Sequence, residues 1–477
     1  MNYRMIRNIL GWLLLFEAGF MLVPLITGLA YRESVVWSFA VAVLLCAVIG
    51  GLCVLKKPKE SVLYARDGFV IVALSWIALS LFGAVPFCIS GVIPNYLDAV
   101  FETVSGFTTT GASILSECEA LPRCMLMWRS FTHWVGGMGV LVFIMAFVPL
   151  SGGQNMHIMK AESPGPSVSK LVPRVKTTAL ILYSIYLGLT FIQFVFLLCG
   201  RMSVFSALCI TFGTAGTGGF GVLNDSLASY SPYIQWVVTA FMLLFSVNFT
   251  CYYLFLLGRF KEAFNGELRR FICIVGAVIL VITLNVRGLF DTLGEALRHV
   301  AFTVAALIST TGFATVDFDA WPELSRTLLV LIMFIGACAG STGGGLKISR
   351  LMILFRGAFN EIGNLIHPRR VRRITIDGHP VDPDVVRATN VYIIWYFLIF
   401  AGSVVLISFD DYDLITNFTA VTATLNNVGP GLGSVGPTGN FAFFSIPSKL
   451  VLIFDMLAGR LELFPMLVLF APSTWKK

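Results

Sequence analysis

The stretch FTTTGAS, residues 107–113, is a polar turn in a chain whose residues are 57% hydrophobic. It follows YLDAVFETVSG, residues 96–106, an apolar run too short to cross the ~30 Å of hydrocarbon in a bilayer. Polar, non-helical backbone is tolerated at membrane depth only inside protein or along a water-filled cavity. Similar turns follow three other short apolar stretches, so we expect four re-entrant segments. These short stretches lie at 96–108, 203–215, 297–309 and 414–426.

The chain as a whole is predicted to be a polytopic membrane protein. It has 477 residues, a mean hydropathy of +0.84 and only 12% charged residues, which is too little charge to cover a soluble protein of this size. The first apolar run is long enough to remain as a helix, so we expect no separate signal peptide. We predict ten spanning helices, at 9–30, 36–55, 69–92, 130–150, 177–199, 233–257, 271–290, 327–350, 391–409 and 447–471.

The distribution of Lys and Arg predicts the orientation of these helices. Most of the 33 Lys and Arg residues fall in loops on the same side as the N-terminus. The positive-inside rule makes that side cytoplasmic, so we expect both termini inside and the four short stretches on the outer face. Since this asymmetry also explains the net charge of +7, no nucleic-acid partner is needed.

The four turns align on a glycine in the sequences TTTGAS, AGTGGF, STTGFA and NNVGPG, centred on Gly111, Gly218, Gly312 and Gly429. Each turn lies between two predicted spans, which indicates a repeated unit. We predict an all-α polytopic membrane protein with two N-terminal helices and four pseudo-fourfold helix–pore-helix–loop–helix repeats around a central ion pathway. The predicted segments are 1–66 for the two leading helices, then 67–160, 161–265, 266–387 and 388–477 for the repeats.

The chemistry of the four turns favours a monovalent cation. The turns contain no carboxylate, which a divalent site would want, but offer carbonyls and hydroxyls that can replace the hydration shell of a monovalent ion. Each short helix would also point its partially negative C-terminus toward the ring. Any single turn could equally be a simple helix connection, so this prediction depends on all four. The predicted filter residues are Thr109, Thr110, Gly111, Gly216, Thr217, Gly218, Thr310, Thr311, Gly312, Asn427, Val428 and Gly429.

The stretch GSTGGGLK, residues 340–347, resembles a phosphate-binding loop, but Leu346 separates the last glycine from Lys347 and no strand precedes it. We interpret it instead as a break within a membrane helix, because three consecutive glycines are costly in a continuous helix. Such a break could form a gate below the third turn, or it could be a close-packing helix crossover.

Arg460 lies inside a predicted span, where a guanidinium is costly and should face a cavity and a partner. Glu462 and Asp455 are poorly spaced to be that partner on the same helix. We hypothesise that Arg460 and the glycine-rich loop form a constriction, the alternative being a structural ion pair with another helix. The predicted gate residues are Gly340, Ser341, Thr342, Gly343, Gly344, Gly345, Lys347 and Arg460.

Other polar residues leave alternatives open. Cys118 and Cys124 share one polar loop and could form a disulfide or remain unpaired thiols. Four acidic residues near the outer ends of the short stretches could attract cations to the mouth or stabilise helix N-termini. They are Asp98, Glu102, Glu295 and Asp413. Because the sequence shows no catalytic constellation, we do not expect an enzyme.

Longer motifs resemble the Trk/Ktr/HKT superfamily of potassium transporters over nearly the whole chain. The two extra N-terminal helices look like its TrkH branch rather than its KtrB branch. The motifs are WRSFTHWVGGMGVLV (128–142), KAESPGPSVSKLVPRVKTTA (160–179), STTGFATVDF (309–318), GACAGSTGGGLKISR (336–350), NNVGPGLGSVGP (426–437) and KLVLIFDMLAGRLELFPMLVLFAPSTW (449–475).

This resemblance implies potassium uptake across the bacterial cytoplasmic membrane, with potassium as the substrate and no organic cofactor. It also implies a homodimer in the lipid bilayer and a cytoplasmic nucleotide-binding regulatory subunit of the TrkA type. In the family the glycine-rich loop gates the pathway and an arginine at the position of Arg460 projects into the pore. The turns at 215–217 and 426–428 depart from the family pattern, but the four glycines, which go with potassium preference, are present.

Two other classes of protein remain as alternatives from the residues alone. A coupled carrier for an organic solute would use inverted repeats and a midplane site, whereas these turns share one side. A membrane enzyme or receptor would need a polar cluster that the sequence does not show. The basic segment 356–387 could contact a dimer partner or regulator, or it could be an interfacial helix held by anionic lipid.

Overall fold

A computed structural model describes residues 1–55, 64–139, 175–367 and 373–476. Helices dominate these residues, and the strands are limited to one two-stranded hairpin. In chain order the elements are α1 (Tyr3–Phe20), α2 (Leu22–Tyr31), α3 (Val36–Leu55), α4 (Ala65–Gly83), α5 (Val85–Ile89), α6 (Tyr96–Phe107), α7 (Arg123–Gly137), α10 (Val175–Cys199), α11 (Val204–Ala215), α12 (Pro232–Phe245), α13 (Phe249–Leu256), α14 (Phe260–Ala263), α15 (Gly266–Val286), α16 (Leu293–Ile308), α17 (Glu323–Ile335), α18 (Ile348–Ile366), β1 (Thr375–Ile376), β2 (His379–Pro380), α19 (Pro383–Ile407), α20 (Leu414–Leu425), α21 (Ile446–Arg460), α22 (Phe464–Phe470) and α23 (Pro472–Trp475).

The predicted class, an all-α polytopic membrane protein, is confirmed. Within the described ranges, six helical segments are long and apolar enough to cross a membrane. They are Tyr3–Tyr31, Val36–Leu55, Ala65–Ile89, Thr177–Cys199, Gly266–Leu289 and Pro383–Asp410. In five of the six, less than half of the most apolar stretch is buried inside the protein, as expected for helices at a lipid boundary, whereas Ala65–Ile89 is 61% buried.

Three of the remaining four predicted spans are not continuous helices, and among these breaks only the one within 327–350 was predicted, from its glycine-rich stretch. The span predicted at 233–257 is two helices, α12 and α13, bent by 91°. The one at 327–350 stops at Ile335 because the next residue, Gly336, has a φ of 69°. The one at 447–471 breaks where Leu463 has a φ of 67°. Apolar composition is the same on both sides of such a break, so hydropathy alone could not show it. The fourth helix, α7, ends at Gly137, and most of its predicted remainder lies outside the described residues.

The four short apolar stretches form α6, α11, α16 and α20, as predicted. The first, second and fourth have 12 residues and α16 has 16, or roughly 18–24 Å at 1.5 Å per residue. Each begins with a side chain that accepts a hydrogen bond from the backbone N–H two or three residues later. These N-caps are Asn95, Ser203, Thr292 and Asp413. We call α6, α11, α16 and α20 the half-helices, and the turns after them loops 1 to 4.

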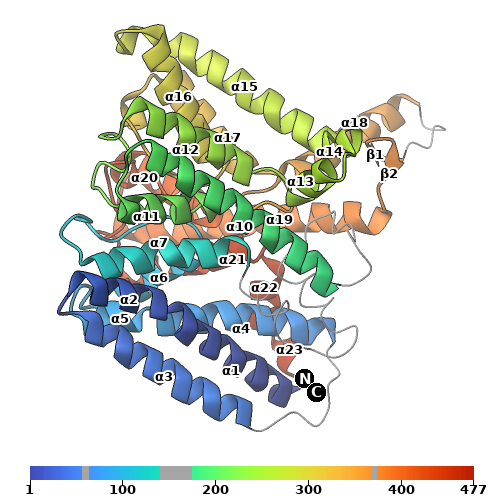
Figure 1. Ribbon diagram of the computed structural model, residues 1–477. Coiled ribbons are helices and arrows are strands. Elements are labelled where there is room, and N and C mark those ends of the chain that lie inside the picture. Colours follow the sequence, from blue (N-terminus) through green and yellow to red (C-terminus); the bar gives the residue numbers. More distant parts are fainter. Residues whose placement is uncertain (56–63, 140–174, 368–372, 477) are drawn as a thin grey trace.

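The half-helices pack in a closed circle. Each contacts the helix that follows the preceding loop: α11 packs on α7, α16 on α12, α20 on α17, and α6 on α21. The last of these contacts joins the final part of the chain to its first loop. Both chain ends lie on the same side of the molecule, as do α18 and the β1–β2 hairpin, whereas the half-helices lie toward the other side (Figure 1). We call these the terminal side and the outer side.

An ion pair strengthens the junction where the circle closes. The Lys449 ammonium, near the start of α21, lies 2.7 Å from a carboxylate oxygen of Asp98 in the first turn of α6. The two side chains are only 8% and 23% exposed. Asp98, predicted as a mouth or helix-end charge, therefore joins two distant parts of the chain.

We expect Lys449→Met to lower the thermal stability of the purified protein. The substitution leaves Asp98 largely buried without its ammonium, a loss of about 1–3 kcal/mol. Thermal unfolding in detergent, followed by tryptophan fluorescence, measures this effect. The double variant Lys449→Met/Asp98→Asn should regain part of the loss because no uncompensated charge remains. Equal stability of the single variant and the unmodified protein would contradict the expectation.

Candidate ion pathway

All four half-helices end in the same hydrogen-bonded cap. In each, the second residue past the helix has a left-handed backbone, and the N–H of the next residue reaches back to a carbonyl in the last helical turn, as in a Schellman motif. The left-handed residues are Thr109, Thr217, Thr310 and Asn427, with φ of 54°, 55°, 59° and 54°. The returning bonds are Thr110 to Ser105, Gly218 to Gly213, Thr311 to Ala306 and Val428 to Ala423, at 2.8–2.9 Å.

Threonine at this left-handed position is unusual. Glycine normally occupies it, and a β-branched residue there costs roughly 1–2 kcal/mol. Three of the four loops carry a threonine, and its hydroxyl is bonded in each. The Thr310 hydroxyl accepts from the Gly344 N–H at 2.7 Å, and the Thr109 hydroxyl accepts from Arg460 at 3.2 Å. Strain of this kind persists where the surroundings over-determine it and is characteristic of functional sites.

The glycines pack the four loops into a closed ring. Two residues after each left-handed residue lies a glycine that also has a positive φ. A Cβ on it would lie less than 3 Å from a carbonyl oxygen of the next loop, belonging to the residue just before that loop's own glycine. The four pairs are Gly111 with Gly218, Gly219 with Thr311, Gly312 with Val428, and Gly429 with Thr110. Only glycine allows so close an approach of two backbones.

This geometry corrects the alignment of loop 2. The counterpart of Gly111 is Gly219, which has a φ of 76° and lies four residues past the end of α11, as Gly111 lies four past the end of α6. The alignment of the four turns in the sequence placed Gly218 at this position because Gly218 and Gly219 are adjacent. Gly216, predicted as a filter residue, occupies the helix-capping position that Thr108 has in loop 1. The ring is therefore more regular than the sequence alignment indicated.

A polar cavity of about 140 Å³ opens above the ring on the outer side. The four glycines line its floor, together with residues of the segments that follow each loop, such as Ser113, Asn224 and Thr438. No acidic side chain is among the described residues that line it. Apart from Arg129, the described lining residues are uncharged, so an entering cation would meet mainly neutral oxygen groups, the kind of ligand that suits a monovalent ion.

The glycine-rich segment between α17 and α18, residues 336–347, lies beneath the ring. The Thr342 N–H and hydroxyl both bond to the Phe245 carbonyl at the end of α12, at 3.4 and 3.1 Å. At the other side, a Cβ on Gly344 would clash with the Asn426 carbonyl. Together with the Gly344–Thr310 bond, these contacts place the predicted gate residues directly against loops 3 and 4. We call residues 336–347 the intramembrane loop.

Arg460 joins this loop to the ring. Its guanidinium donates to the carbonyls of Thr342, at 2.8 Å, and of Gly137, at 2.7 Å, and also to the carbonyl of Gly136. With its bond to Thr109, it connects α21, the end of α7, loop 1 and the intramembrane loop. Lys347 bonds to the Gly343 carbonyl within the intramembrane loop. Two cationic side chains therefore lie on the inner side of the ring.

Glu267 was missed by the sequence analysis. It lies in the first turn of α15, is 8% exposed, and accepts from Ala339 N–H at 2.8 Å and Ser349 N–H at 3.2 Å. These two residues flank the glycine-rich stretch, so one carboxylate holds both ends of the intramembrane loop. In the sequence Glu267 is an ordinary acidic residue at a helix start, and no local signal distinguishes it.

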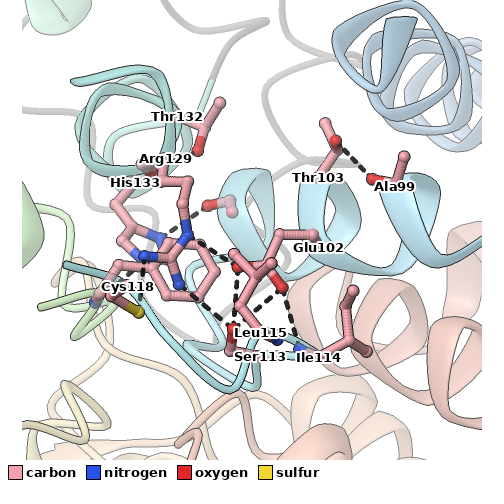
Figure 2. Close-up of polar contacts among 12 residues, drawn as sticks. Ala99, Glu102, Thr103, Ser113, Ile114, Leu115, Cys118, Arg129, Thr132 and His133 are labelled. Atoms are coloured by element: carbon pink, nitrogen blue, oxygen red, sulfur yellow. Dashed lines mark hydrogen bonds and ion pairs between the residues drawn. The ribbon is translucent and has the colours of Figure 1, made fainter. Parts of the chain in front are cut away.

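The predicted mouth acids have different roles. Glu102 is buried and paired with Arg129 at 2.8 Å (Figure 2). Glu295 lies near Arg298 in the first turn of α16. Asp413 caps α20, and hydrogen bonds from Thr416 hold the pKa of its carboxyl below the usual range.

The two loop cysteines, whose pairing the sequence left open, are both free thiols. Cys118 bonds to Arg129 through its sulfur, whereas Cys124 is buried at the start of α7.

The fold and this ring define a multi-pass α-helical membrane protein whose four half-helices pack in a closed circle. The TrkH family model, described as a cation transport protein, matches residues 37–477. The chain therefore belongs to the TrkH family of cation transport proteins.

Named relatives and a solved structure agree with this assignment. The Trk system potassium uptake protein TrkH of Salmonella typhimurium is 35% identical over 486 residues, covering 100% of both chains. TrkG of Escherichia coli is 32% identical over 100% of this chain and 99% of its own. The crystal structure of the potassium transporter TrkH from Vibrio parahaemolyticus superposes with a TM-score of 0.89 at 33% identity, with 100% of both chains covered. These relatives are transporters and not enzymes.

We expect Thr310→Val to loosen the intramembrane loop. The change keeps the β-branched shape and its left-handed strain, but removes the acceptor of the buried Gly344 N–H, a loss of about 1–3 kcal/mol. Hydrogen–deuterium exchange of peptides covering 336–347 should become faster. Thr217→Val is the matched control, because the Thr217 hydroxyl bonds to Gly216 of its own loop. Equal exchange in the two variants would contradict the role given to the Thr310 hydroxyl.

Proposed function

We propose that the protein takes up potassium ions across the bacterial cytoplasmic membrane through the ring of loops 1 to 4. The observation that carries this proposal is the closed circle of glycine–carbonyl contacts at the C-terminal ends of four half-helices. The half-helix dipoles favour a cation at that point, and neutral oxygens favour a monovalent one. The named relatives are potassium uptake proteins, which supports potassium as the ion.

The proposed filter follows the corrected alignment of loop 2. Each loop contributes the left-handed residue, the residue after it and the glycine, whose carbonyls would replace part of the ion's hydration shell. Gly219 takes the place of Gly216 in the predicted set. The proposed filter residues are Thr109, Thr110, Gly111, Thr217, Gly218, Gly219, Thr310, Thr311, Gly312, Asn427, Val428 and Gly429.

The intramembrane loop and Arg460 form the proposed gate. The loop contacts elements on opposite sides of the ring, α12 and loop 4, and Arg460 bonds to its Thr342 carbonyl. A fixed positive charge beneath a cation filter opposes exit of the ion toward the cytoplasm. The loop would have to leave this position for potassium to pass, and Glu267 would hold its two ends during that movement.

The orientation, assembly and regulation of the protein complete the proposal. We place both termini in the cytoplasm, which agrees with their common side and with the Lys and Arg distribution (Figure 1). The predicted segments ending at 66, 160, 265, 387 and 477 would then be the leading helices and four pore units. A homodimer and a TrkA-type nucleotide-binding subunit are proposed partners. Exposed Phe355, Phe359 and Leu365 on α18, at the terminal side, supply apolar surface for such contacts.

A carrier for an organic solute is the second candidate, and no observation favours it. Such a site would need a cavity near the midplane large enough for the solute. The described cavity at the ring instead opens outward and ends at four closely packed glycines.

We expect Gly111→Ser to reduce discrimination between potassium and sodium by about tenfold or more. The new Cβ would be strained at a φ of 81° and would push against the Gly218 carbonyl, so loops 1 and 2 must separate. Rubidium flux into liposomes, competed with potassium or sodium, measures the ratio. Gly402→Ser is the control, because a Cβ there meets nothing within 4 Å. Intact selectivity in Gly111→Ser would contradict the proposed filter.

We expect Arg460→Ala to raise potassium flux through the protein without a regulator by about tenfold or more. The change removes a unit charge from the inner side of the ring and the bond to the Thr342 carbonyl that helps to hold the intramembrane loop. Flux in liposomes with and without the regulatory subunit provides the measurement. Arg269→Ala, at a side chain that is 61% exposed, is the control for a lost positive charge. Unchanged flux and unchanged regulation in Arg460→Ala would exclude the gate role.

A further inference from the structure

One carboxylate fixes the outer part of loop 1. Glu102 projects from α6 and accepts hydrogen bonds from the Ile114 N–H at 3.0 Å, from the Ser113 hydroxyl at 3.0 and 3.1 Å, and from Arg129 Nε at 2.8 Å (Figure 2). Its side chain has no exposed surface. Ser113 and Ile114 follow Gly111 by two and three residues. The half-helix that ends at the ring therefore also holds the backbone that leaves it.

Arg129 carries this support to a second loop. Its Nη2 donates to the Ser113 hydroxyl at 3.2 Å, its Nη1 lies 3.5 Å from the Cys118 sulfur, and its guanidinium lies 4.1 Å from the centre of the Phe220 ring. Phe220 is the residue after Gly219 in loop 2. The guanidinium is 2% exposed yet lines the cavity above the ring. Its charge is thus close to the path of an entering cation.

Ser113 extends the network to the last part of the chain. Its carbonyl accepts from the Phe441 N–H at 2.8 Å, in the segment that follows loop 4. The pair of Glu102 and Arg129 consequently touches, directly or through Ser113, the backbone or side chains of three of the four segments that surround the outer cavity.

In the other three loops, neutral side chains hold the residues that directly follow the ring glycine. Carboxylates act only further along: Asp319 accepts from the Gly433 N–H at 3.1 Å after loop 4, and Glu119 accepts from the Asn224 N–H at 2.9 Å after loop 2. In loop 4 the Leu432 N–H, at the position of Ile114, bonds to the Thr419 hydroxyl at 3.0 Å. In loop 3 the Thr315 hydroxyl bonds to His299 Nδ1 at 2.9 Å, and in loop 2 the Phe220 N–H bonds to His133 Nε2 at 3.3 Å. Among the described contacts behind the ring, loop 1 alone uses a buried ion pair. The ring is close to fourfold in its backbone but not in its support.

We propose that Glu102 and Arg129 set the potassium selectivity of the ring as positioning residues that hold loop 1 against loop 2 without touching the ion. This inference rests on the filter role proposed above and assigns it a supporting pair. The carboxylate has two effects: it fixes the backbone just beyond Gly111, and it neutralises the guanidinium beside the cavity. Loss of the carboxylate alone leaves a positive charge beside the cavity and frees the backbone at Ser113 and Ile114. Loss of both charges frees the same backbone but leaves no charge to repel a cation.

The experiment compares Glu102→Gln with the double variant Glu102→Gln/Arg129→Gln in the full-length protein in liposomes. Rubidium influx is measured against external potassium and sodium, which gives the half-saturating concentration of each ion and the maximal rate. Glu295→Gln is the matched control, because it removes a carboxylate at the outer end of a half-helix that holds no loop backbone among the described contacts. Monodispersity and thermal unfolding in detergent show whether each variant is folded.

We expect Glu102→Gln to raise the half-saturating potassium concentration and to reduce the potassium-to-sodium ratio by about tenfold. The double variant should regain much of the potassium affinity while its selectivity ratio stays low, because only the charge has been relieved. Unchanged ratios in folded Glu102→Gln, or a loss confined to the maximal rate, would overturn the inference. If Glu102→Gln does not fold, Ser113→Ala tests the same support with the ion pair intact, and a normal ratio there would overturn it.

The outcome also separates this inference from the function on which it rests. Lost selectivity in Gly111→Ser with normal selectivity in Glu102→Gln would refute the supporting pair alone. Normal selectivity in both variants would refute the filter itself.

Discussion

The polar, non-helical backbone of loops 1 to 4, enclosed among apolar helices, is the constraint on which the rest of the structure depends. Each unpaired N–H or C=O group in hydrocarbon costs several kcal/mol, so the turns must satisfy their own polar groups or present them to water. At the half-helix ends the shared cap satisfies the polar groups internally, because the N–H that turns back donates a hydrogen bond to a carbonyl of the last helical turn. The carbonyls just beyond the cap remain for the ring. Short helices, closely packed glycines and an outward-facing cavity all follow from meeting this one requirement.

The ring is held mainly from outside, although the Asn427 side-chain amide of loop 4 donates to the Thr110 hydroxyl of loop 1 at 2.9 Å. Carbonyl oxygens brought together repel one another, and the left-handed threonines add roughly 1–2 kcal/mol of strain each. The compensation comes from contacts behind and beneath the ring, such as those of Glu102, His133 and Arg460. Such contacts allow an otherwise unfavourable backbone to persist. This is why buried polar side chains gather around these turns in a chain that is otherwise so apolar.

The sequence predicts the parts of this arrangement that depend on local signals. Hydropathy and length locate the half-helices, and the glycines of loops 1, 3 and 4 are aligned correctly. Loop 2 was misaligned by one residue because Gly218 and Gly219 are adjacent, and only the φ angle and the contact with Thr311 distinguish them. The helix break in the third unit was predicted from its consecutive glycines, although the helix already ends at Ile335, whereas the break near Leu463 was missed because apolar residues continue on both sides.

Long-range contacts could not be predicted for a different reason. Arg460 and Thr109 are 351 residues apart, and Glu267 and Ala339 are 72 apart. No spacing rule relates residues that meet only when separate helices pack. The sequence correctly indicated that a buried arginine needs partners, but the partners described here are backbone carbonyls and a hydroxyl, which leave no signature in a sequence. Glu102 shows the same limit: its place near a half-helix start suggested a mouth charge, whereas packing buries it beneath Arg129.

The hydroxyls of Thr109 and Thr310 link the ring to what lies beneath it. Each belongs to a strained residue of the ring, and each also accepts a bond from Arg460 or from Gly344 of the intramembrane loop. Movement of that loop away from the ring therefore removes a contact that helps to hold the strained turn. The Thr109 and Thr310 hydroxyls must then form other hydrogen bonds, or the backbone of these residues must leave its left-handed conformation. The proposed gate cannot move without changing the support of the proposed filter above it, so in this proposal conduction and selectivity share the same hydrogen bonds.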